Sequence, residues 1–326
     1  MRPILVAHNA VAAADDPSTR DVLAQVGFVT SALDALGLRQ RVLAVGDGGV
    51  DGEALESAAA IFNLVESPPG RPGFQVDAAA AFEDFGLPVT GSPAGVIAAT
   101  TDKEGTRRTL TSRGVTVAPG GLLDPADPRL LDRVPPPWIL KPCLEDASLG
   151  LDEGAVTSDP REAAATARRL SQRFGGQPVL VEHLLPGREF NISLLADGDR
   201  VEVLPPAEMT FVDFPDDEPR IVGFKAKWDE DSFAYRHTVR RFLSKDEATL
   251  RSDLEEVARA AWSACGLTGY GRVDLRLDED GVPRVLEVNA NPCLSPDAGF
   301  AAAAVAAGHS PETVVRRILA AAGWTP

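Results

Sequence analysis

The feature that most constrains the fold is the alternation of short apolar runs with helical periodicity in the first 90 residues. Predominantly apolar runs at residues 3–8, 41–45 and 60–66 predict strands. Between the first two runs, apolar residues recur at steps of four and three, the spacing of one helical face: Val22, Val26, Val29, Leu33 and Leu36. This alternation predicts a parallel sheet whose ligand edge lies at the strand carboxyl ends, where Asn63 and Glu66 stand.

The amino-acid composition of the chain changes from about residue 99. A polar, basic helix is expected at Thr101–Gly114, and a Pro-rich stretch then leads into the strand WILKP. A Gly- and Ser-bearing loop, a helix near Arg161–Phe174 and the strand PVLVEHLL follow. The predicted fold is α/β and α+β, with three domains: an N-terminal Rossmann-like domain (1–98), a small α+β lid (99–181) and a C-terminal α+β domain (182–326).

Composition excludes several classes of function. The net charge of −16 disfavours a general binder of nucleic acid or of an anionic membrane, because both require a positive field. No apolar run approaches the roughly 18 residues needed to span a bilayer. The N-terminal apolar run is also too short for a signal peptide. Three scattered cysteines form no disulfide framework, so a cytoplasmic protein is expected.

The strongest local signal is a predicted hairpin, GYGRVDLRLDEDGVPRVLEVNANP. Glu287 and Asn289 are two residues apart on its second strand and share one face, and the turn brings Asp274 opposite them. Three hard oxygen ligands on one face suit Mg²⁺ or Mn²⁺, although a solvated acidic face is the alternative. Arg272 shares the face of Asp274, as a salt-bridge partner or as a group that stabilises an anion.

Three separated lysines form the second signal: Lys103, Lys141 and Lys227. Each alone is an ordinary surface lysine, but together they are what nucleotide phosphates would require in so acidic a chain. The loop Asp146–Gly150, which contains Ser148, has small residues whose backbone N–H groups could close over phosphates.

The segment VLVEHLLPGRE supplies the third signal. Glu182 ends an apolar run, and with the backbone of Leu185 it could read a nucleobase; a surface carboxylate at a strand end is the alternative. Glu189 follows beyond a Pro–Gly turn. The chain has no P-loop, no G-x-G-x-x-G after a strand, no G-x-S-x-G elbow and no H-E-x-x-H, and its four histidines are scattered.

In their order along the chain, these motifs resemble the ATP-grasp enzymes, and among them the D-alanine–D-alanine ligase group. The resemblance covers almost the whole chain and rests on segments in the family's order: LPVTGSPAGVIAATTDKEGTRRTL, WILKP with DASLGL, VLVEHLLPGREFNISLL, VLPPAEMTF, FKAKW, and GYGRVDL with VLEVNANP.

The resemblance implies specific roles for these residues. Lys103, Lys141, Ser148 and Lys227 would contact ATP phosphates, and Lys227 would also take part in catalysis. Glu182 and the Leu185 backbone would hold adenine, and Glu189 would bind ribose. Two Mg²⁺ ions, or Mn²⁺ in their place, would lie on Asp274, Glu287 and Asn289. Arg272 would stabilise the acyl phosphate and the tetrahedral intermediate. The family's frequent dimers make a homodimer an expectation.

The sequence departs from the family where the amino acids bind. The family's Glu–Ser–Tyr trio is replaced by Asp21, Ala147 and Trp228. A family histidine is replaced near Val65, beside Glu66. A glycine and a carboxylate-binding serine are replaced by Cys293 and Ala298. Asp21 and Glu66 are candidates for holding a substrate amine, and Trp228 and Cys293 are further candidate substrate residues.

The predicted function is therefore an ADP-forming carboxylate–amine ligase that acts through an acyl phosphate on small amino-acid-like substrates. An authentic D-alanine–D-alanine ligase, a nucleotide-binding module without ligase activity, a phosphotransferase and a ring-closing ligase remain alternatives.

Overall fold

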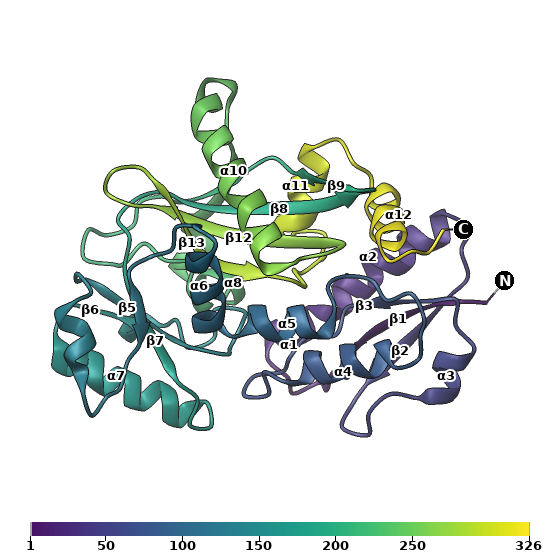
Figure 1. The fold of residues 1–326 in the computed structure, drawn as a ribbon, viewed down its shortest axis with the longest axis horizontal. Coiled ribbons are helices and arrows are strands. Elements are labelled where there is room, and N and C mark those ends of the chain that lie inside the picture. Colours follow the sequence, from purple (N-terminus) through teal and green to yellow (C-terminus); the bar gives the residue numbers. More distant parts are fainter. Residues whose placement is uncertain (1, 326) are drawn as a thin grey trace.

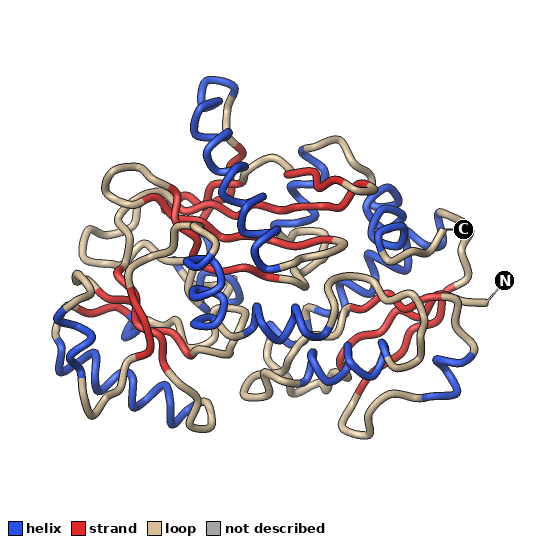
Figure 2. The backbone as a smooth tube through the Cα atoms, viewed as in Figure 1, coloured by secondary structure: helices blue, strands red, loops and turns tan. Residues whose placement is uncertain are grey.

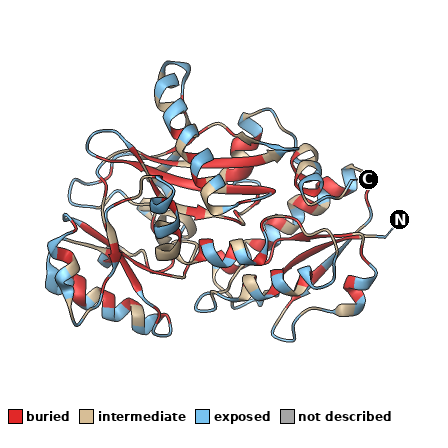
Figure 3. Ribbon diagram, viewed as in Figure 1, coloured by how far each residue is buried: buried red, intermediate tan, exposed pale blue. Residues whose placement is uncertain are grey.

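The computed structural model describes residues 2–325, and its strands form three separate sheets (Figures 1 and 2). In Figure 1 the first sheet lies at the lower right, the second at the lower left and the third above them. Buried residues follow the strands and the inner faces of the helices (Figure 3). The sheets therefore surround a common centre. The predicted site residues belong to the segments around this centre.

The first sheet is parallel, with strand order β2-β1-β3. Its strands are β1 (Ile4–Asn9), β2 (Gln40–Val45) and β3 (Ala60–Asn63), joined and covered by short helices: α1 (Pro17–Arg20), α2 (Val22–Ala35), α3 (Gly52–Glu56) and α4 (Phe74–Glu83). The sequence predicted the parallel sheet, but β3 ends three residues before the predicted 66. The cause is local, because the Asn63 side chain accepts a hydrogen bond from Val65 N at 3.0 Å and turns the chain.

Two helices connect the first sheet to the second: α5 (Ala94–Thr101) and α6 (Lys103–Ser112). The predicted helix Thr101–Gly114 is therefore divided and shorter than expected. Asp102 lies between α5 and α6 in an extended conformation, and its carboxylate accepts from Gly105 N as the N-cap of α6. This break places Lys103 in the first turn of α6, at the edge of the site.

The second sheet is antiparallel, with order β4-β7-β5-β6. Its elements are β4 (Gly120–Leu122), η1 (Pro128–Asp132), β5 (Trp138–Pro142), η2 (Glu153–Ala155), β6 (Val156–Thr157), α7 (Pro160–Arg173) and β7 (Val179–His183). Ala163, Ala167 and Leu170 of α7 pack against the sheet in a core of their own. This separate core agrees with a small α+β lid, although β7 runs two residues past the predicted boundary at 181.

The third sheet has six strands in the order β11-β10-β8-β12-β13, with β9 paired to β8. Its strands are β8 (Glu189–Asp197), β9 (Arg200–Val203), β10 (Ala207–Phe211), β11 (Thr238–Phe242), β12 (Tyr270–Leu277) and β13 (Pro283–Asn289). The helices in this part are α8 (Phe224–Trp228), α9 (Phe233–His237), η3 (Lys245–Glu247), α10 (Ala248–Cys265), α11 (Gly299–Ala306) and α12 (Pro311–Ala321). The predicted hairpin is β12–β13.

The first and third sheets share one hydrophobic core. Val29 and Leu33 of α2 lie in the same cluster as Leu195 of β8, Tyr270 of β12 and Ile318 of α12. Burial of this apolar surface holds the two sheets together.

The three domain boundaries of the sequence analysis remain a proposal.

Candidate active site

A cavity of about 590 Å³ lies where the three sheets meet. Its walls include the residues to which the sequence analysis gave a role in binding or catalysis: Asp21, Glu66, Lys103, Lys141, Ser148, Glu182, Leu185, Glu189, Lys227, Trp228, Arg272, Asp274, Glu287, Asn289 and Cys293. Asn63, which was expected at the ligand edge, is buried and is not part of the wall. Residues up to 272 positions apart in the chain are thus brought to one place. A cavity of this size is in the range that proteins use for small-molecule ligands.

The β12–β13 hairpin forms one wall. Asp274 pairs with Glu287 across the hairpin, Asn289 pairs with Arg272, and a bulge after Asp274 shifts the register of the remaining pairs. Arg272 donates to both oxygens of Asp274, at 2.7 and 2.9 Å, and Asn191 Nδ2 donates to Asp274 at 2.8 Å. The predicted face of two carboxylates, one amide and one arginine is therefore present.

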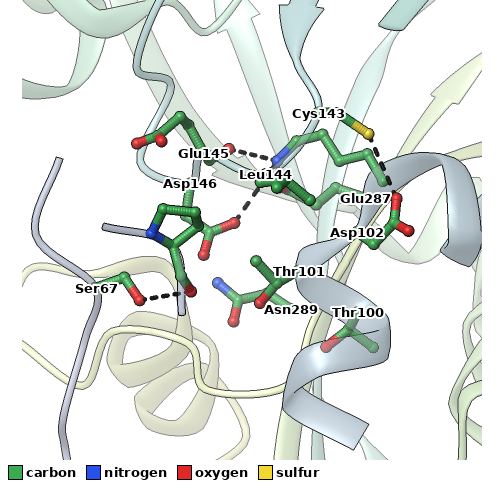
Figure 4. A network of polar contacts seen from close by, with 12 residues as sticks. Ser67, Thr100, Thr101, Asp102, Cys143, Leu144, Glu145, Asp146, Glu287 and Asn289 are labelled. Carbon is green, nitrogen blue, oxygen red and sulfur yellow. Dashed lines mark hydrogen bonds and ion pairs between the residues drawn. The ribbon is translucent and has the colours of Figure 1, made fainter. Parts of the chain in front are cut away.

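Lys103 contacts this wall from α6. Its Nζ lies 3.2 Å from Glu287 Oε1 and 3.6 Å from Asp146, and it donates to the Glu145 carbonyl (Figure 4). Burial alone would lower the pKa of Lys103, but the two carboxylates outweigh it and raise that pKa. Lys103, Lys227 and Arg272 in turn hold the pKa of Glu287 below its usual range despite burial. Both groups are therefore charged at neutral pH.

The carboxylate of Glu182, on β7, is almost fully buried and forms ion pairs with two cationic side chains. Lys141 Nζ lies 2.8 Å from one oxygen, and Arg107 Nη1 lies 2.9 Å from the other. Arg107 also donates to the backbone carbonyls of Ala118 and Gly120. This arrangement fixes the carboxylate at the strand edge, where lone pairs remain for a further donor.

Glu189 and Lys227 lie near the same wall. Arg276 Nη1 contacts Glu189 at 3.0 Å in a buried ion pair, and Arg276 also donates to the backbone carbonyls of Gly187 and Arg220. Burial raises the pKa of Glu189, and Arg276 opposes that shift. Burial, assisted by Arg272, lowers the pKa of Lys227. The charged form of Lys227 is therefore less stable, relative to its neutral form, than the charged form of an exposed lysine.

The loop between β5 and η2 covers the cavity and is fastened to α8. Ala147 and Ser148 adopt left-handed conformations, with φ of 55° and 62°. Trp228 Nε1 donates to the Ala147 carbonyl at 3.0 Å, and Ser148 Oγ donates to the Val222 carbonyl at 2.8 Å. Non-glycine residues in this region are strained, so these contacts help to hold the loop in position.

Another part of the cavity wall is acidic. Asp21 accepts hydrogen bonds from Cys293 Sγ at 2.9 Å and from Ser295 Oγ at 2.8 Å. Glu66 accepts from Gln25 Nε2 at 2.7 Å, and burial raises the pKa of Glu66 to about 7. Burial, together with Glu66 and Asp21, raises the pKa of the Cys293 thiol, so this cysteine is a hydrogen-bond donor and not a thiolate.

Several site residues escaped the sequence reasoning because they act on the selected residues from elsewhere in the chain: Gln25, Arg107, Asn191, Arg276 and Ser295. Of these, Asn191 and Arg276 had a local signal, because each lies on a strand two residues from a selected residue and shares its face. Arg107 had only the basic character of its helix.

Comparison with known proteins identifies the family. The family model for the C-terminus of D-Ala D-Ala ligase matches residues 128–320, which is more than half of the chain. A D-alanine–D-alanine ligase of Nitrosococcus oceani is 32% identical and covers 77% of this chain and 74% of its own. The chain belongs to the D-alanine–D-alanine ligase family.

A further relative and a solved structure resemble the chain over most of its length. An uncharacterised protein of Sinorhizobium fredii, y4sG, is 31% identical over 79% of this chain and 73% of its own. A D-alanine–D-alanine ligase structure from Bacillus anthracis superimposes with a TM-score of 0.75 at 18% identity, over 99% of this chain and 97% of its own. The predicted ATP-grasp fold is thereby confirmed.

Membership of the D-alanine–D-alanine ligase family gives the class of reaction. The chain is an ATP-dependent ligase that forms C–N bonds and acts on small molecules. Among residues 2–325, no helix is long and apolar enough to cross a membrane. Within that range no group of three or more His, Cys, Asp and Glu side chains could hold a metal.

Proposed function

We propose that this enzyme joins the carboxylate of an amino acid, or of an amino-acid-like donor, to the amine of a second small molecule, at the expense of ATP and through an acyl phosphate. One observation carries the proposal: the same cavity has a cationic, carboxylate-bearing wall and, in another part, an acidic group of side chains. The first suits phosphates and metal, and the second suits a substrate ammonium.

The cationic wall would bind ATP. Lys103, Lys141, Ser148 and Lys227 line the cavity and would contact the phosphates, and Glu182 with the Leu185 backbone would hold adenine. We assign ribose to Glu189. A Bacillus anthracis D-alanine–D-alanine ligase of the same fold has been solved in complex with ATP.

Magnesium fits the donor set of this wall. Asp274, Glu287 and Asn289 offer hard oxygens on one face, and Asn191 and Arg272 already orient the Asp274 carboxylate. Mg²⁺ held there would neutralise charge on the phosphoryl oxygens.

The reaction would proceed in two steps. A donor carboxylate oxygen bonds to the γ-phosphorus while the bond to ADP breaks, giving an acyl phosphate. The amine nitrogen then bonds to the carbonyl carbon, loses a proton and expels phosphate. Lys227 and Arg272 both line the cavity, and they would stabilise the negative charge that accumulates on these oxygens. The loop fastened by Trp228 would exclude water, which otherwise hydrolyses the acyl phosphate.

The substrate would differ from a pair of D-alanines. Ala147, Trp228, Cys293 and Ala298 replace groups that the D-alanine–D-alanine ligase resemblance leads one to expect, and Asp21 is engaged with Cys293 and Ser295. Loss of a hydroxyl that binds a carboxylate costs about 1–3 kcal/mol. We therefore propose Asp21 and Glu66 as the groups that receive the donor's ammonium.

We also propose a cytoplasmic location and a homodimer. The three cysteines are free thiols in the described chain, as is usual in a reducing compartment. The homodimer is proposed from the resemblance alone.

The test measures ADP and phosphate release with Mg-ATP across amino acids, singly and in pairs, with mass spectrometry of the products. We expect release to require a carboxylate and an amine other than two D-alanines, and to be lost in Asp274→Asn and Glu287→Gln. Asp280→Asn, in the exposed turn of the same hairpin, is the matched control and should remain active. Turnover with D-alanine alone would make the enzyme an authentic D-alanine–D-alanine ligase. ATP binding without turnover on any pair would overturn ligation.

A further inference from the structure

The edge strand β11 carries two unsatisfied polar atoms. Among the described residues, the buried side-chain polar atoms without a hydrogen-bond partner are Thr238 Oγ1 and Arg240 Nε. The two residues are two positions apart on β11 and therefore lie on the same face of the strand. A buried polar atom without a partner costs free energy, so two on one face require an explanation.

This face of β11 lines the cavity. Thr238 and Arg240 both belong to its wall, as does Met209, which pairs with Arg240 across β10 and β11. The neighbouring Arg241 behaves differently, because its guanidinium contacts Glu208 at 2.5 Å and Glu247 at 2.9 Å and it is not part of the cavity wall. Of these two arginines, only the one that lines the cavity has a buried donor without a partner.

The surroundings of Arg240 suit an anion. Its Nη2 donates to the Asp297 carbonyl at 3.0 Å, which fixes the guanidinium beside Ala298, another residue of the cavity wall. Burial lowers the pKa of Arg240, and Arg272 lowers it further while Asp297 raises it. Because an arginine stays protonated, the result is a fixed positive charge that is incompletely paired.

We propose that Arg240 and Thr238 form the subsite for a carboxylate of the amine acceptor. The assignment rests on the proposed ligase function and names the acceptor as an amino acid, in place of a simple amine. A guanidinium with a free Nε–H and a neighbouring hydroxyl matches the two oxygens of a carboxylate. The subsite lies beside Ala298, so the arginine would supply the contact that a serine hydroxyl at that position would otherwise give.

Binding can be measured without knowing the natural substrate. Wild-type enzyme, saturated with Mg²⁺ and a non-hydrolysable ATP analogue, is titrated by calorimetry with glycine, D-alanine, L-alanine and β-alanine and with the amide of each. We expect at least one acid to bind more tightly than its amide by about 10-fold or more, since a hydrogen bond to a charged group is lost in the amide.

Two variants and one control locate this preference. In Arg240→Gln the preference for acid over amide should fall to about 1, and in Thr238→Val it should weaken severalfold. Thr238→Val should unfold at the same temperature or higher, because it removes an unpaired buried hydroxyl from a nearly isosteric side chain. Arg236→Gln, on α9 and outside the cavity wall, should keep the wild-type preference.

Several results would overturn the subsite: equal or absent binding of acids and amides by the wild type, a preference that survives in Arg240→Gln, or one that also disappears in Arg236→Gln. A surviving preference would belong to the donor carboxylate. Failure of the ligase function is distinguishable, because it would show as absent donor-dependent phosphate release while the acid preference and its loss in Arg240→Gln persist.

Discussion

Glu66, at the scale of a single residue, lies just beyond β3, where burial raises the pKa of its carboxyl from 4.5 to about 7. The folded protein therefore holds this proton more tightly than the unfolded chain. The stabilising contribution is complete below about pH 4.5 and is lost as the pH rises toward 7. Such a shift corresponds to at most about 3 kcal/mol.

We predict that Glu66→Gln removes this pH dependence. The amide resembles the protonated acid and can still accept the hydrogen bond from Gln25. The free energy of unfolding of the variant relative to wild type should increase between pH 5 and pH 7, by about 1–3 kcal/mol. Chemical denaturation at several pH values measures this. A constant difference across that range would show that Glu66 titrates normally in the folded enzyme.

At the scale of elements, the close contact of β4 with β7 positions Glu182. A Cβ on Gly120 would lie 2.3 Å from the Val181 carbonyl and 2.9 Å from Glu182 Cα, so the strands could not keep their separation. We predict that Gly120→Ala lowers the free energy of unfolding by about 1–3 kcal/mol and weakens ATP binding. Thermal unfolding and nucleotide titration check both effects.

The adjacent glycine provides the matched control for this prediction. A Cβ on Gly121 would meet Leu130 at 3.5 Å, an ordinary contact, and Gly121 lacks the left-handed conformation that excludes alanine. Gly121→Ala should change stability by less than about 1 kcal/mol and leave ATP binding intact. Equal effects of the two substitutions would mean that close approach at Gly120 does not position Glu182.

At the scale of the whole molecule, the cavity joins three sheets, so a ligand there should stabilise them together. Mg-ATP at 100 times its dissociation constant should add about 2.7 kcal/mol to the free energy of unfolding. ATP with a chelator should add much less, because Asp274 and Glu287 would then repel the phosphates. Thermal unfolding against ATP concentration, with and without Mg²⁺, measures the difference. Equal protection would contradict the metal assignment.

Local pattern was sufficient to predict the elements and one wall of the site. The parallel strands near residues 4, 40 and 60, the hairpin, and the common face of Asp274, Glu287 and Asn289 follow from the side-chain periods of strands and helices, which extend over a few residues. The same reasoning misplaced the end of β3 and the start of α6, because a single Asn63 or Asp102 side chain redirects the backbone there.

The partners of the site residues were decided only by the tertiary structure. Arg107 and Glu182 are 75 positions apart, Arg276 and Glu189 are 87 apart, and Cys293 and Asp21 are 272 apart. Likewise, nothing in the sequence TVRRF shows that Arg240 keeps an unused donor while Arg241 is paired. Sequence alone thus determined which side chains share a strand face, because that depends on local geometry. Which charges neutralise one another depends on how the three sheets pack, because burial and distance between remote segments exist only in the folded chain.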